Sequence, residues 1–316
     1  MSEFALIERI RRRARSRDDV LLGIGDDAAV LALPPGQQLV AAQDTLNIGV
    51  HFPPGTAAAD IGWKALAVNL SDLAAMGAEP AWCLLSLSLP AADAAWLDAF
   101  LDGFCALAER HGVALVGGDT TRGPLSISVA IHGFVPPDTA LTRAGANIDD
   151  EVWVTGTPGD AAAALSLGDA ADAWLRQRLD RPTPRIAAGV GLRGLASACI
   201  DVSDGLVADL GHVLAASRVG AEIELARLPV SAALGAVLSG DARWQLQLGG
   251  GDDYELCFTA PRARHAEVRA ALDASATPAT VIGRIVDAPG CRVRAPDGSA
   301  WQPRHGGFDH FDAPAG

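Results

Sequence analysis

The chain has 316 residues, of which 49% are hydrophobic and 20% are charged. This length exceeds what one hydrophobic core usually serves, so we expect two domains, and the composition is that of a packed globular protein. The formal net charge of −13 argues against nucleic acid and anionic membrane surfaces as partners, because both require basic patches. An anionic substrate would need bound cations to reverse the local field.

The cysteines and the N-terminus indicate a cytoplasmic protein that does not bind membranes. The five cysteines stand singly, with no CxxC pair, so we expect them to be reduced and mostly buried. Residues 1–17 contain six arginines and no apolar core segment, unlike a signal peptide. Later apolar stretches are broken within about a dozen residues, which is too short for a membrane span.

Apolar periodicity predicts alternating helices and strands in the first half of the chain. The predicted helices cover residues 4–16, 56–76 and 91–111, and the predicted strands cover residues 20–24, 39–42, 82–89, 113–116 and 125–135. A polar run at 136–150 then marks the expected domain junction. We place the boundary between residues 137 and 138, which gives domains 1–137 and 138–316.

The second half continues the alternation. Strands are predicted at 152–155, 200–204, 244–248 and 254–259, with an alanine-rich helix after the first of them. A Gly-Gly-Asp sequence follows a predicted strand in both halves, at 117–119 and 250–252. The pattern as a whole predicts an α/β (α+β) fold.

Aspartates gather where the predicted strands end. Eight lie at such ends, and one projects from an otherwise apolar helix: Asp26, Asp27, Asp44, Asp119, Asp201, Asp204, Asp252 and Asp253, with Asp72 on the helix. Strand ends are where α/β proteins bind ligands, and carboxylate clusters suit Mg²⁺ together with substrate phosphates. Asp beside Gly is also a common turn pair, but its repetition after apolar strands favours a metal and phosphate site.

The common nucleotide-binding motifs do not account for this pattern. The chain contains no G-x-x-x-x-G-K-[ST] loop and no protein-kinase H-R-D or D-F-G set. Residues 189–194 match G-x-G-x-x-G, but the residues before them look helical and no acid stands about 20 residues beyond on a following strand. We therefore do not expect this match to bind a dinucleotide.

Eight segments resemble the thiamine-monophosphate kinase family, in order along the chain. They are GIGDDAAV (23–30), DTLNIGVHF (44–52), KALAVNLSDLAAMGA (64–78), GGDTTRGP (117–124), LTRAGA (141–146), VTGTPGDAA (154–162), IDVSDGLVADLGH (200–212) and GGDDYELCF (250–258), and a GFDHF tail follows at 307–311. The resemblance implies the two-domain fold of the aminoimidazole-ribonucleotide synthetase superfamily, with a homodimer formed by pairing of the N-terminal sheets and a C-terminal mixed sheet covered by helices. It also implies conversion of thiamine monophosphate and ATP into thiamine diphosphate and ADP.

The resemblance further implies roles for particular residues. Several Mg²⁺ ions would be held by Asp27, Asp44, Asp72, Asp119, Asp201 and Asp204, with Asp26 a weaker candidate. Of these, the metal-mediated catalytic residues would be Asp44, Asp72, Asp119 and Asp204. ATP would be bound by Gly118, Asp119, Arg143 and Ser203, and thiamine monophosphate by His51, Asp252 and Phe308. Domain 1–137 would then be the ATP-binding, magnesium-binding and dimerisation domain.

Two positions depart from the family pattern. Ala42 and Gln43 stand where the family usually carries Ser or Thr, so one metal site loses a hydroxyl ligand that only a backbone carbonyl or the Gln43 amide could replace. The family's Glu-Asp pair is Asp252-Asp253 here, which is one methylene shorter at its first position.

The charges of the substrates suggest direct in-line transfer. A phosphate monoester has a second pKa near 6, so the acceptor oxygen is largely anionic at neutral pH and needs no strong base. The reaction needs alignment and suppression of charge repulsion, which bound metal ions provide. We expect no phospho-enzyme intermediate.

Three other functions fit parts of the sequence. A selenophosphate or aminoimidazole-ribonucleotide synthetase is one, although the first cysteine is Cys83 and not near the N-terminus, as in selenophosphate synthetases. A maturation or scaffold protein, like the hydrogenase-maturation relatives, is another, but those carry a C-terminal cysteine and this chain ends in Ala-Pro-Ala-Gly. The third is a metal-binding homologue without turnover.

Overall fold

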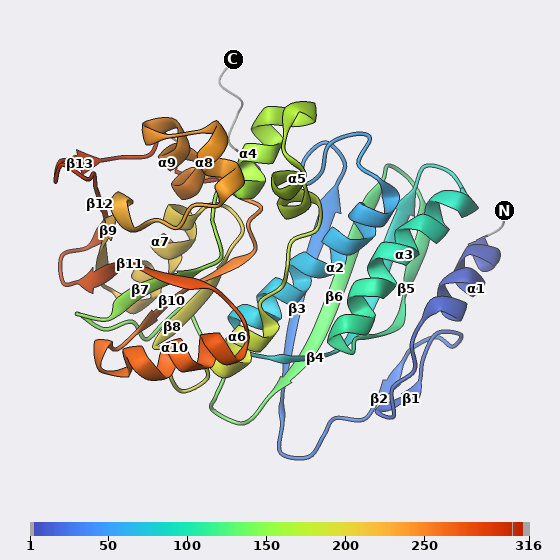
Figure 1. Cartoon of the computed structure of the whole chain (residues 1–316). Helices are drawn as coiled ribbons and strands as arrows, with labels where there is room; N and C mark the ends of the chain where they lie inside the picture. Colours follow the sequence, from blue (N-terminus) through green and yellow to red (C-terminus); the bar gives the residue numbers. More distant parts are fainter. Residues whose placement is uncertain (1–2, 305, 312–316) are drawn as a thin grey trace. The chain divides into compact units, whose positions relative to one another are not determined.

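The computed structural model describes residues 3–304 and 306–311. Its internal contacts divide the chain into two compact units, each with its own sheet (Figure 1). The N-terminal unit comprises Met1–Leu73 and Ala78–Ala140, and the C-terminal unit comprises Ala74–Gly77 and Leu141–Gly316. No helix in the described residues is both long and apolar enough to cross a bilayer.

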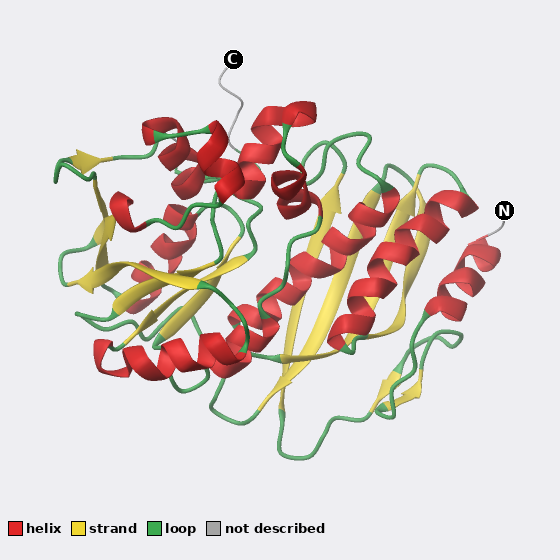
Figure 2. Cartoon of the chain, in the orientation of Figure 1, coloured by secondary structure: helices red, strands yellow, loops and turns green. Residues whose placement is uncertain are grey.

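The N-terminal unit is built on a four-stranded sheet of order β3-β6-β4-β5. Its strands are β3 (Gln38–Asn47), β4 (Glu79–Leu89), β5 (Ala114–Arg122) and β6 (Ser126–Val135). Only the β4–β5 pair is parallel. Two long helices, α2 (Ala58–Ala75) and α3 (Ala94–His111), lie over one face of the sheet (Figure 2). The unit also contains α1 (Glu3–Arg13) and a small sheet of β1 (Val20–Leu22) and β2 (Val30–Leu31).

Local sequence explains why α3 starts and stops where it does. The Asp93 carboxylate accepts the N–H groups of Ala95 and Trp96, which caps the N-terminus, and Gly112 ends the helix in the left-handed conformation. The helix also touches α2 through glycine. A Cβ atom on Gly103 would lie 1.7 Å from the carbonyl oxygen of Ala59, so no side chain fits at this crossing.

The C-terminal unit is built on a seven-stranded mixed sheet of order β13-β12-β9-β11-β7-β10-β8. Its strands are β7 (Glu151–Thr155), β8 (Ala198–Val202), β9 (Gly220–Glu224), β10 (Glu255–Ala260), β11 (Ala279–Val286), β12 (Gly290–Arg294) and β13 (Ala300–Trp301). The β9–β12 pair is parallel and the other pairs are antiparallel.

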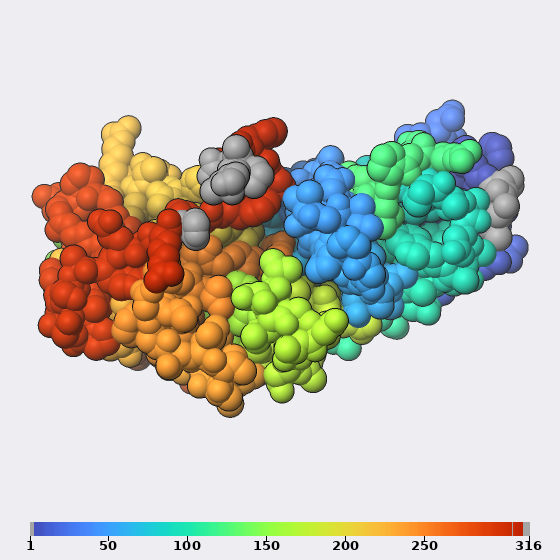
Figure 3. All heavy atoms as spheres, turned by 90° about the horizontal axis from the view of Figure 1, so that it is seen from above, coloured from blue at the N-terminus to red at the C-terminus, as the bar shows by residue number. Residues whose placement is uncertain are grey.

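Helices complete the C-terminal unit. They are α4 (Asp160–Leu167), α5 (Ala173–Asp180), α6 (Ile186–Gly191), α7 (Leu206–Ser217), α8 (Ala232–Val237), α9 (Gly240–Gly249) and α10 (His265–Ala274), with 3₁₀ turns at Gly168–Ala170, Leu225–Arg227 and Arg262–Arg264. Helices α4, α5, α8 and α9 pack together, and Figure 3 shows them as adjoining green and orange surfaces. The α/β class is confirmed in both units.

One predicted strand is wrong. Residues 244–248 lie in α9, although their alternation of apolar and polar residues fits a strand. Trp244 and Leu248 are four residues apart, so a helix turns both toward the core of the C-terminal unit, and both pack there. The acidic pair Asp252-Asp253 therefore follows a helix.

Two strands run further than predicted. Strand β3 continues to Asn47 and β5 continues to Arg122, so Asp44 and Asp119 lie inside strands and not at their ends. The glycines at 117 and 118 do not stop β5, because Gly118 adopts φ +137° and stays paired with Leu85.

A buried charge cluster ties helices to the C-terminal sheet. The fully buried Glu255 carboxylate on β10 accepts from Arg178 at 2.7 Å and from Arg185 at 2.6 Å and 2.7 Å. Thr155 on β7 donates to the same carboxylate at 2.6 Å. Burial alone would raise the pKa of Glu255, but the charges of Arg185 and Arg178 hold it below its usual value. The cluster therefore stays ionised.

The close crossing of α2 and α3 predicts that one added methyl group at Gly103 lowers the stability of the fold. We expect Gly103→Ala to lower the free energy of unfolding by at least about 2 kcal/mol, because the new Cβ must push the two backbones apart. The control is Gly211→Ala in α7, where a Cβ meets nothing within 4 Å. That variant should gain roughly 0.4–1 kcal/mol from the lower entropy of its unfolded chain. Urea unfolding of both variants checks this, and equal stabilities would contradict it.

Candidate functional site

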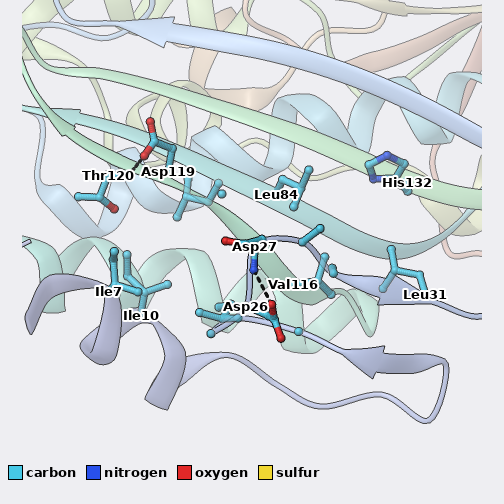
Figure 4. A pocket seen from close by; sticks show the side chains of 18 of the residues that line it. Ile7, Ile10, Asp26, Asp27, Leu31, Leu84, Val116, Asp119, Thr120 and His132 are labelled. Carbon is cyan, nitrogen blue, oxygen red and sulfur yellow. Dashed lines mark hydrogen bonds between the residues drawn. The ribbon is translucent and has the colours of Figure 1, made fainter. Parts of the chain in front are cut away.

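Three of the predicted metal ligands of the N-terminal unit, Asp26, Asp27 and Asp119, line one pocket of about 900 Å³ (Figure 4). Asp26 and Asp27 enter it from the loop between β1 and β2, and Asp119 enters it from β5 beside Gly118. Apolar side chains line much of the remaining wall, among them Ile7, Ile10, Leu84 and Val116. The pocket thus combines an acidic part with an apolar one.

Backbone amides hold two of these acids. An Asp26 side-chain oxygen accepts the N–H of Asp27 at 2.9 Å, and an Asp119 side-chain oxygen accepts the N–H of Thr120 at 2.8 Å (Figure 4). Gly118 has a packing role as well, because a Cβ there would lie 1.8 Å from the carbonyl oxygen of Leu85. The glycine lets β5 approach β4 closely and so sets the position of Asp119.

His132 lines the same pocket from β6. Its Nδ1 atom is buried and has no hydrogen-bond partner among the residues that the structure describes. Burial holds the pKa of this imidazole below its usual value. A neutral histidine therefore faces a pocket that also contains three carboxylates.

Asp44 and Asp72 lie outside the lining of this pocket and are linked through Asn69. The Asn69 side-chain oxygen accepts the backbone N–H of Asp44 at 2.9 Å, and its amide nitrogen donates to the carbonyl of Ala65 at 2.9 Å. Asp72 follows Asn69 by one helical turn on α2. A buried asparagine thus joins the strand that carries one acid to the helix that carries the other.

His51 is held in the loop after β3. Its Nδ1 accepts the backbone N–H of Asn47 at 3.0 Å, and its carbonyl accepts from the buried Lys64 ammonium at 2.9 Å. Because Nδ1 is an acceptor, the neutral ring carries its proton on Nε2. The Nδ1 lone pair of His51 is therefore already used by the backbone.

Four predicted residues of the C-terminal unit meet at the loop after β8. Ser203 and Asp204 belong to this loop, residues 203–205, which joins β8 to α7. The carbonyl of Ser203 accepts the N–H of Asp252 at 2.8 Å, and the carbonyl of Asp204 accepts the N–H of Phe308 at 2.9 Å. Asp201 is buried two residues earlier, within β8. Burial raises the pKa of Asp204, whereas the nearby His310 and His212 act to lower it.

Arg143 is not brought to this loop. The carbonyl of Arg143 accepts from Ser217, the last residue of α7, whereas Ser203 precedes the first turn of that helix. A 12-residue helix is about 18 Å long, so the two predicted ATP ligands lie at opposite ends of α7.

The two neighbouring acids at 252 and 253 differ in environment. Asp253 is fully buried, and its two oxygens accept the N–H of Gly159 at 2.8 Å and 3.0 Å. Burial raises the pKa of Asp253 well above its usual range. Asp252 is partly exposed, with φ +69°, and accepts from the Tyr254 hydroxyl at 3.1 Å. Asp252 is thus the acid of the pair that a ligand can reach.

No three His, Cys, Asp or Glu side chains form a metal-binding group in the part of the chain that the structure describes. The carboxylates are therefore not assembled as a closed protein cage of the kind seen in structural metal sites.

Two residues of the site were not predicted from the sequence. They are Asn69, which binds the backbone of Asp44, and Asp209, which binds the 203–205 loop.

The raised pKa of Asp253 predicts a pH effect on stability. The unfolded carboxyl loses its proton near pH 3.9, but the buried carboxyl keeps it to a higher pH. Above about pH 4 the free energy of unfolding therefore falls, by at most about 1.4 kcal/mol per pH unit, until the pH reaches the folded-state pKa.

Asp253→Asn keeps an oxygen for the Gly159 N–H and has no proton to lose. Its free energy of unfolding should therefore fall less steeply as the pH rises. Urea unfolding of both proteins from about pH 5 to about pH 8 measures the difference. Identical pH slopes for the two proteins would contradict the assignment.

Comparison with known proteins gives one consistent result. Residues 25–135 match the family described as AIR synthase related protein, N-terminal domain, and residues 147–296 match the corresponding C-terminal domain. The chain is 50% identical to the thiamine-monophosphate kinase of Escherichia coli K12, over 99% of both chains. It is 53% identical to the crystal structure of thiamine-monophosphate kinase from Stenotrophomonas maltophilia K279a, with a TM-score of 0.88 over 95% of this chain and 98% of that one.

A structure of AaThiL complexed with AMPPCP and TMP aligns with a TM-score of 0.78 and 34% identity, over 98% of this chain and 97% of that one. The identity to the kinases extends over nearly the whole chain, across both units. The chain therefore belongs to the thiamine-monophosphate kinase family of AIR synthase related proteins.

Proposed function

We propose that this protein transfers the terminal phosphoryl group of ATP to the phosphate of thiamine monophosphate, giving thiamine diphosphate and ADP. The observation that carries the proposal is 50% identity over 99% of the chain to a thiamine-monophosphate kinase. A relative that aligns over 98% of the chain binds AMPPCP, an ATP analogue, together with TMP.

The residue roles belong to the same proposal. ATP is bound by Gly118, Asp119, Arg143 and Ser203, and thiamine monophosphate by His51, Asp252 and Phe308. Support for the second group comes from the C-terminal unit, where the 203–205 loop bonds to the backbones of Asp252 and Phe308. Since Arg143 lies at the far end of α7 from that loop, Arg143 and Ser203 would contact different parts of ATP or different ATP molecules.

The carboxylates fit magnesium by their chemistry. We propose that Mg²⁺ is held by Asp27, Asp44, Asp72, Asp119, Asp201 and Asp204, with Asp26 as a further candidate. Hard oxygen donors suit this ion, which is commonly bound by one or two carboxylates together with substrate phosphates and water. When bound, Mg²⁺ supplies the positive charge that lets phosphates approach a protein of net charge −13.

The strand geometry narrows what can replace the lost hydroxyl near Asp44. Alternate residues of a strand point to opposite faces, so Gln43 points away from the face that carries Asp44. Ala42 shares the face of Asp44 but has no oxygen in its side chain. The Gln43 amide is therefore a poor substitute, and water or a backbone carbonyl would complete that metal site.

The protein's own groups orient the reaction more than they perform acid–base chemistry. The acceptor phosphate is already largely anionic at neutral pH. The Nδ1 of His51 already accepts the N–H of Asn47, so this nitrogen is not available as a base. We infer that His51 binds the anionic phosphate and does not remove a proton, and that transfer is direct, without a phospho-enzyme.

We also propose a cytoplasmic homodimer formed by pairing of the N-terminal sheets. In the described N-terminal unit, α2 and α3 lie over one sheet face (Figure 2), whereas Leu39 on β3 is 49% exposed. Exposed apolar side chains on a sheet are typical of an interface. The five free cysteines fit a reducing compartment.

The dimer is tested by substitution of the exposed Leu39 on β3. Leu39→Asp should shift the molecular mass in solution from that of two chains to that of one, because charges would then meet across the paired sheets. Light scattering coupled to size exclusion measures this. Leu165→Asp is the control, because Leu165 is also exposed but lies on α4 of the other unit. A wild-type protein that elutes as a monomer would refute the dimer.

The function is tested by product analysis. Purified protein with Mg-ATP should release ADP when thiamine monophosphate is added, with stoichiometric thiamine diphosphate, and should not respond to thiamine. Asp72→Asn should lower kcat by at least about a hundredfold, because one oxygen donor to the metal is lost. Asp273→Asn, an exposed acid on α10, should keep wild-type activity. ATP binding without any turnover of thiamine monophosphate would refute the proposal.

A further inference from the structure

Two segments distant in the sequence meet at the 203–205 loop of the C-terminal unit. Residues 250–254 contact it through the N–H of Asp252, which donates to the Ser203 carbonyl at 2.8 Å, and the tail contacts it through the N–H of Phe308, which donates to the Asp204 carbonyl at 2.9 Å. The contacts are close. A Cβ on Gly251 would lie 2.4 Å from the Ser203 carbonyl oxygen.

The other side of the same loop is bound to a single oxygen atom. Oδ2 of Asp209 accepts the backbone N–H of Ser203 at 3.0 Å, of Asp204 at 3.1 Å and of Gly205 at 3.1 Å. Asp209 lies in the first turn of α7 and is only 3% exposed. Gly205, which precedes the helix, has no side chain to cap it, so Asp209 performs that task from within the helix.

The planar peptide bond links these two sets of hydrogen bonds. In a trans peptide the N–H and C=O groups point in opposite directions and cannot rotate separately. The peptide that joins Ser203 to Asp204 donates to Asp209 through its N–H and accepts from Asp252 through its C=O. The next peptide, which joins Asp204 to Gly205, donates to Asp209 and accepts from Phe308. The two peptides therefore act as rigid connectors between Asp209 and the substrate-side backbone.

We propose that Asp209 is a positioning residue that orients both peptides and thereby places Ser203 and Asp204 relative to Asp252 and Phe308. The proposal rests on the proposed phosphotransferase function for its kinetic consequences, but its geometric content does not. Asp209 itself contacts neither substrate; it acts through the backbone. Without the Asp209 carboxylate the three amides lose their common acceptor. The positions of Asp252 and Phe308 relative to the loop are then no longer fixed.

The kinetic consequence is a loss on both substrate sides at once. Displacement of reacting groups by about 1 Å costs on the order of a hundredfold in rate. We expect Asp209→Ala to lower kcat about a hundredfold and to raise the KM values for both ATP and thiamine monophosphate. Because all three amides bond to one oxygen, Asp209→Asn, whose amide oxygen can take the place of Oδ2, should stay within about tenfold of wild type.

A matched control separates positioning from general loss of stability. Asp150 is 4% exposed and its carboxylate accepts from the N–H of Asn147 and the hydroxyl of Ser197, which lie elsewhere in the unit. Asp150→Asn should lower the melting temperature but leave kcat and both KM values near wild type. All kinetics are measured at a temperature at which circular dichroism shows each variant to be folded.

Amide hydrogen exchange provides the readout that does not depend on activity. In Asp209→Ala the amides of Asp252 and Phe308 should exchange at least about tenfold faster than in wild type, whereas in Asp150→Asn they should not change. This measurement decides the proposal even if the wild-type protein does not phosphorylate thiamine monophosphate. If Asp209→Ala does not fold, wild-type-like exchange and kinetics of Asp209→Asn support the proposal.

Two results would overturn it. The first is an Asp209→Ala protein with wild-type kinetics and unchanged exchange at Asp252 and Phe308, which would make the three hydrogen bonds irrelevant to the site. The second is an Asp209→Asn protein that loses about a hundredfold in kcat, which would mean that the negative charge acts directly and not through hydrogen bonding.

Discussion

Hydrogen bonds from backbone amides to carboxylates are the interaction on which the candidate sites of both units depend. Four acids are held in this way: Asp26, Asp119, Asp209 and Asp253. An amide donor fixes the direction of an aspartate side chain without adding a positive side chain, although burial still raises the pKa of Asp209 and Asp253. In the N-terminal unit Asp26 and Asp119 thus share one pocket in a protein of net charge −13, and in our proposal a bound cation provides the positive charge.

Two glycines that precede aspartates of the candidate sites allow a close approach of backbone segments. Backbone can reach a carboxylate or another backbone segment closely only where no Cβ intervenes, as at Gly118 against Leu85 and at Gly251 against Ser203. The pairs Gly118-Asp119 and Gly251-Asp252 are thus sites of close backbone approach, and not only turns. This also explains why β5 continues as a strand through its two glycines.

The sequence predicted much of the fold because local signals and tertiary packing agreed. The helices α2 and α3 and the strands β4, β6, β7 and β10 lie close to their predicted ranges. The strand predicted at 244–248 failed because alternation over five residues cannot separate a strand from a helix whose buried positions are four apart. Asp209 escaped notice because an acid in the first turn of a helix is ordinary, and only the structure shows three amides meeting at one oxygen.

The roles of neighbouring acids could not be read from the sequence at all. Asp252 and Asp253 are identical in type, but one is reachable and the other is buried beneath the Gly159 amide. Asp44 and Asp119 both lie within strands of one sheet, yet only Asp119 lines the pocket shown in Figure 4. Such differences arise from the packing of distant segments, which residue spacing does not encode.

In our proposal these carboxylates bind phosphate ligands only through a bound cation. Isothermal titration calorimetry measures the affinity of the protein for ATP, once in buffer with Mg²⁺ and once in buffer with EDTA instead of Mg²⁺. We expect measurable affinity for ATP with Mg²⁺ and an affinity at least about a hundredfold lower without it, since the acids would then repel the phosphates. Equal affinity under the two conditions would contradict it.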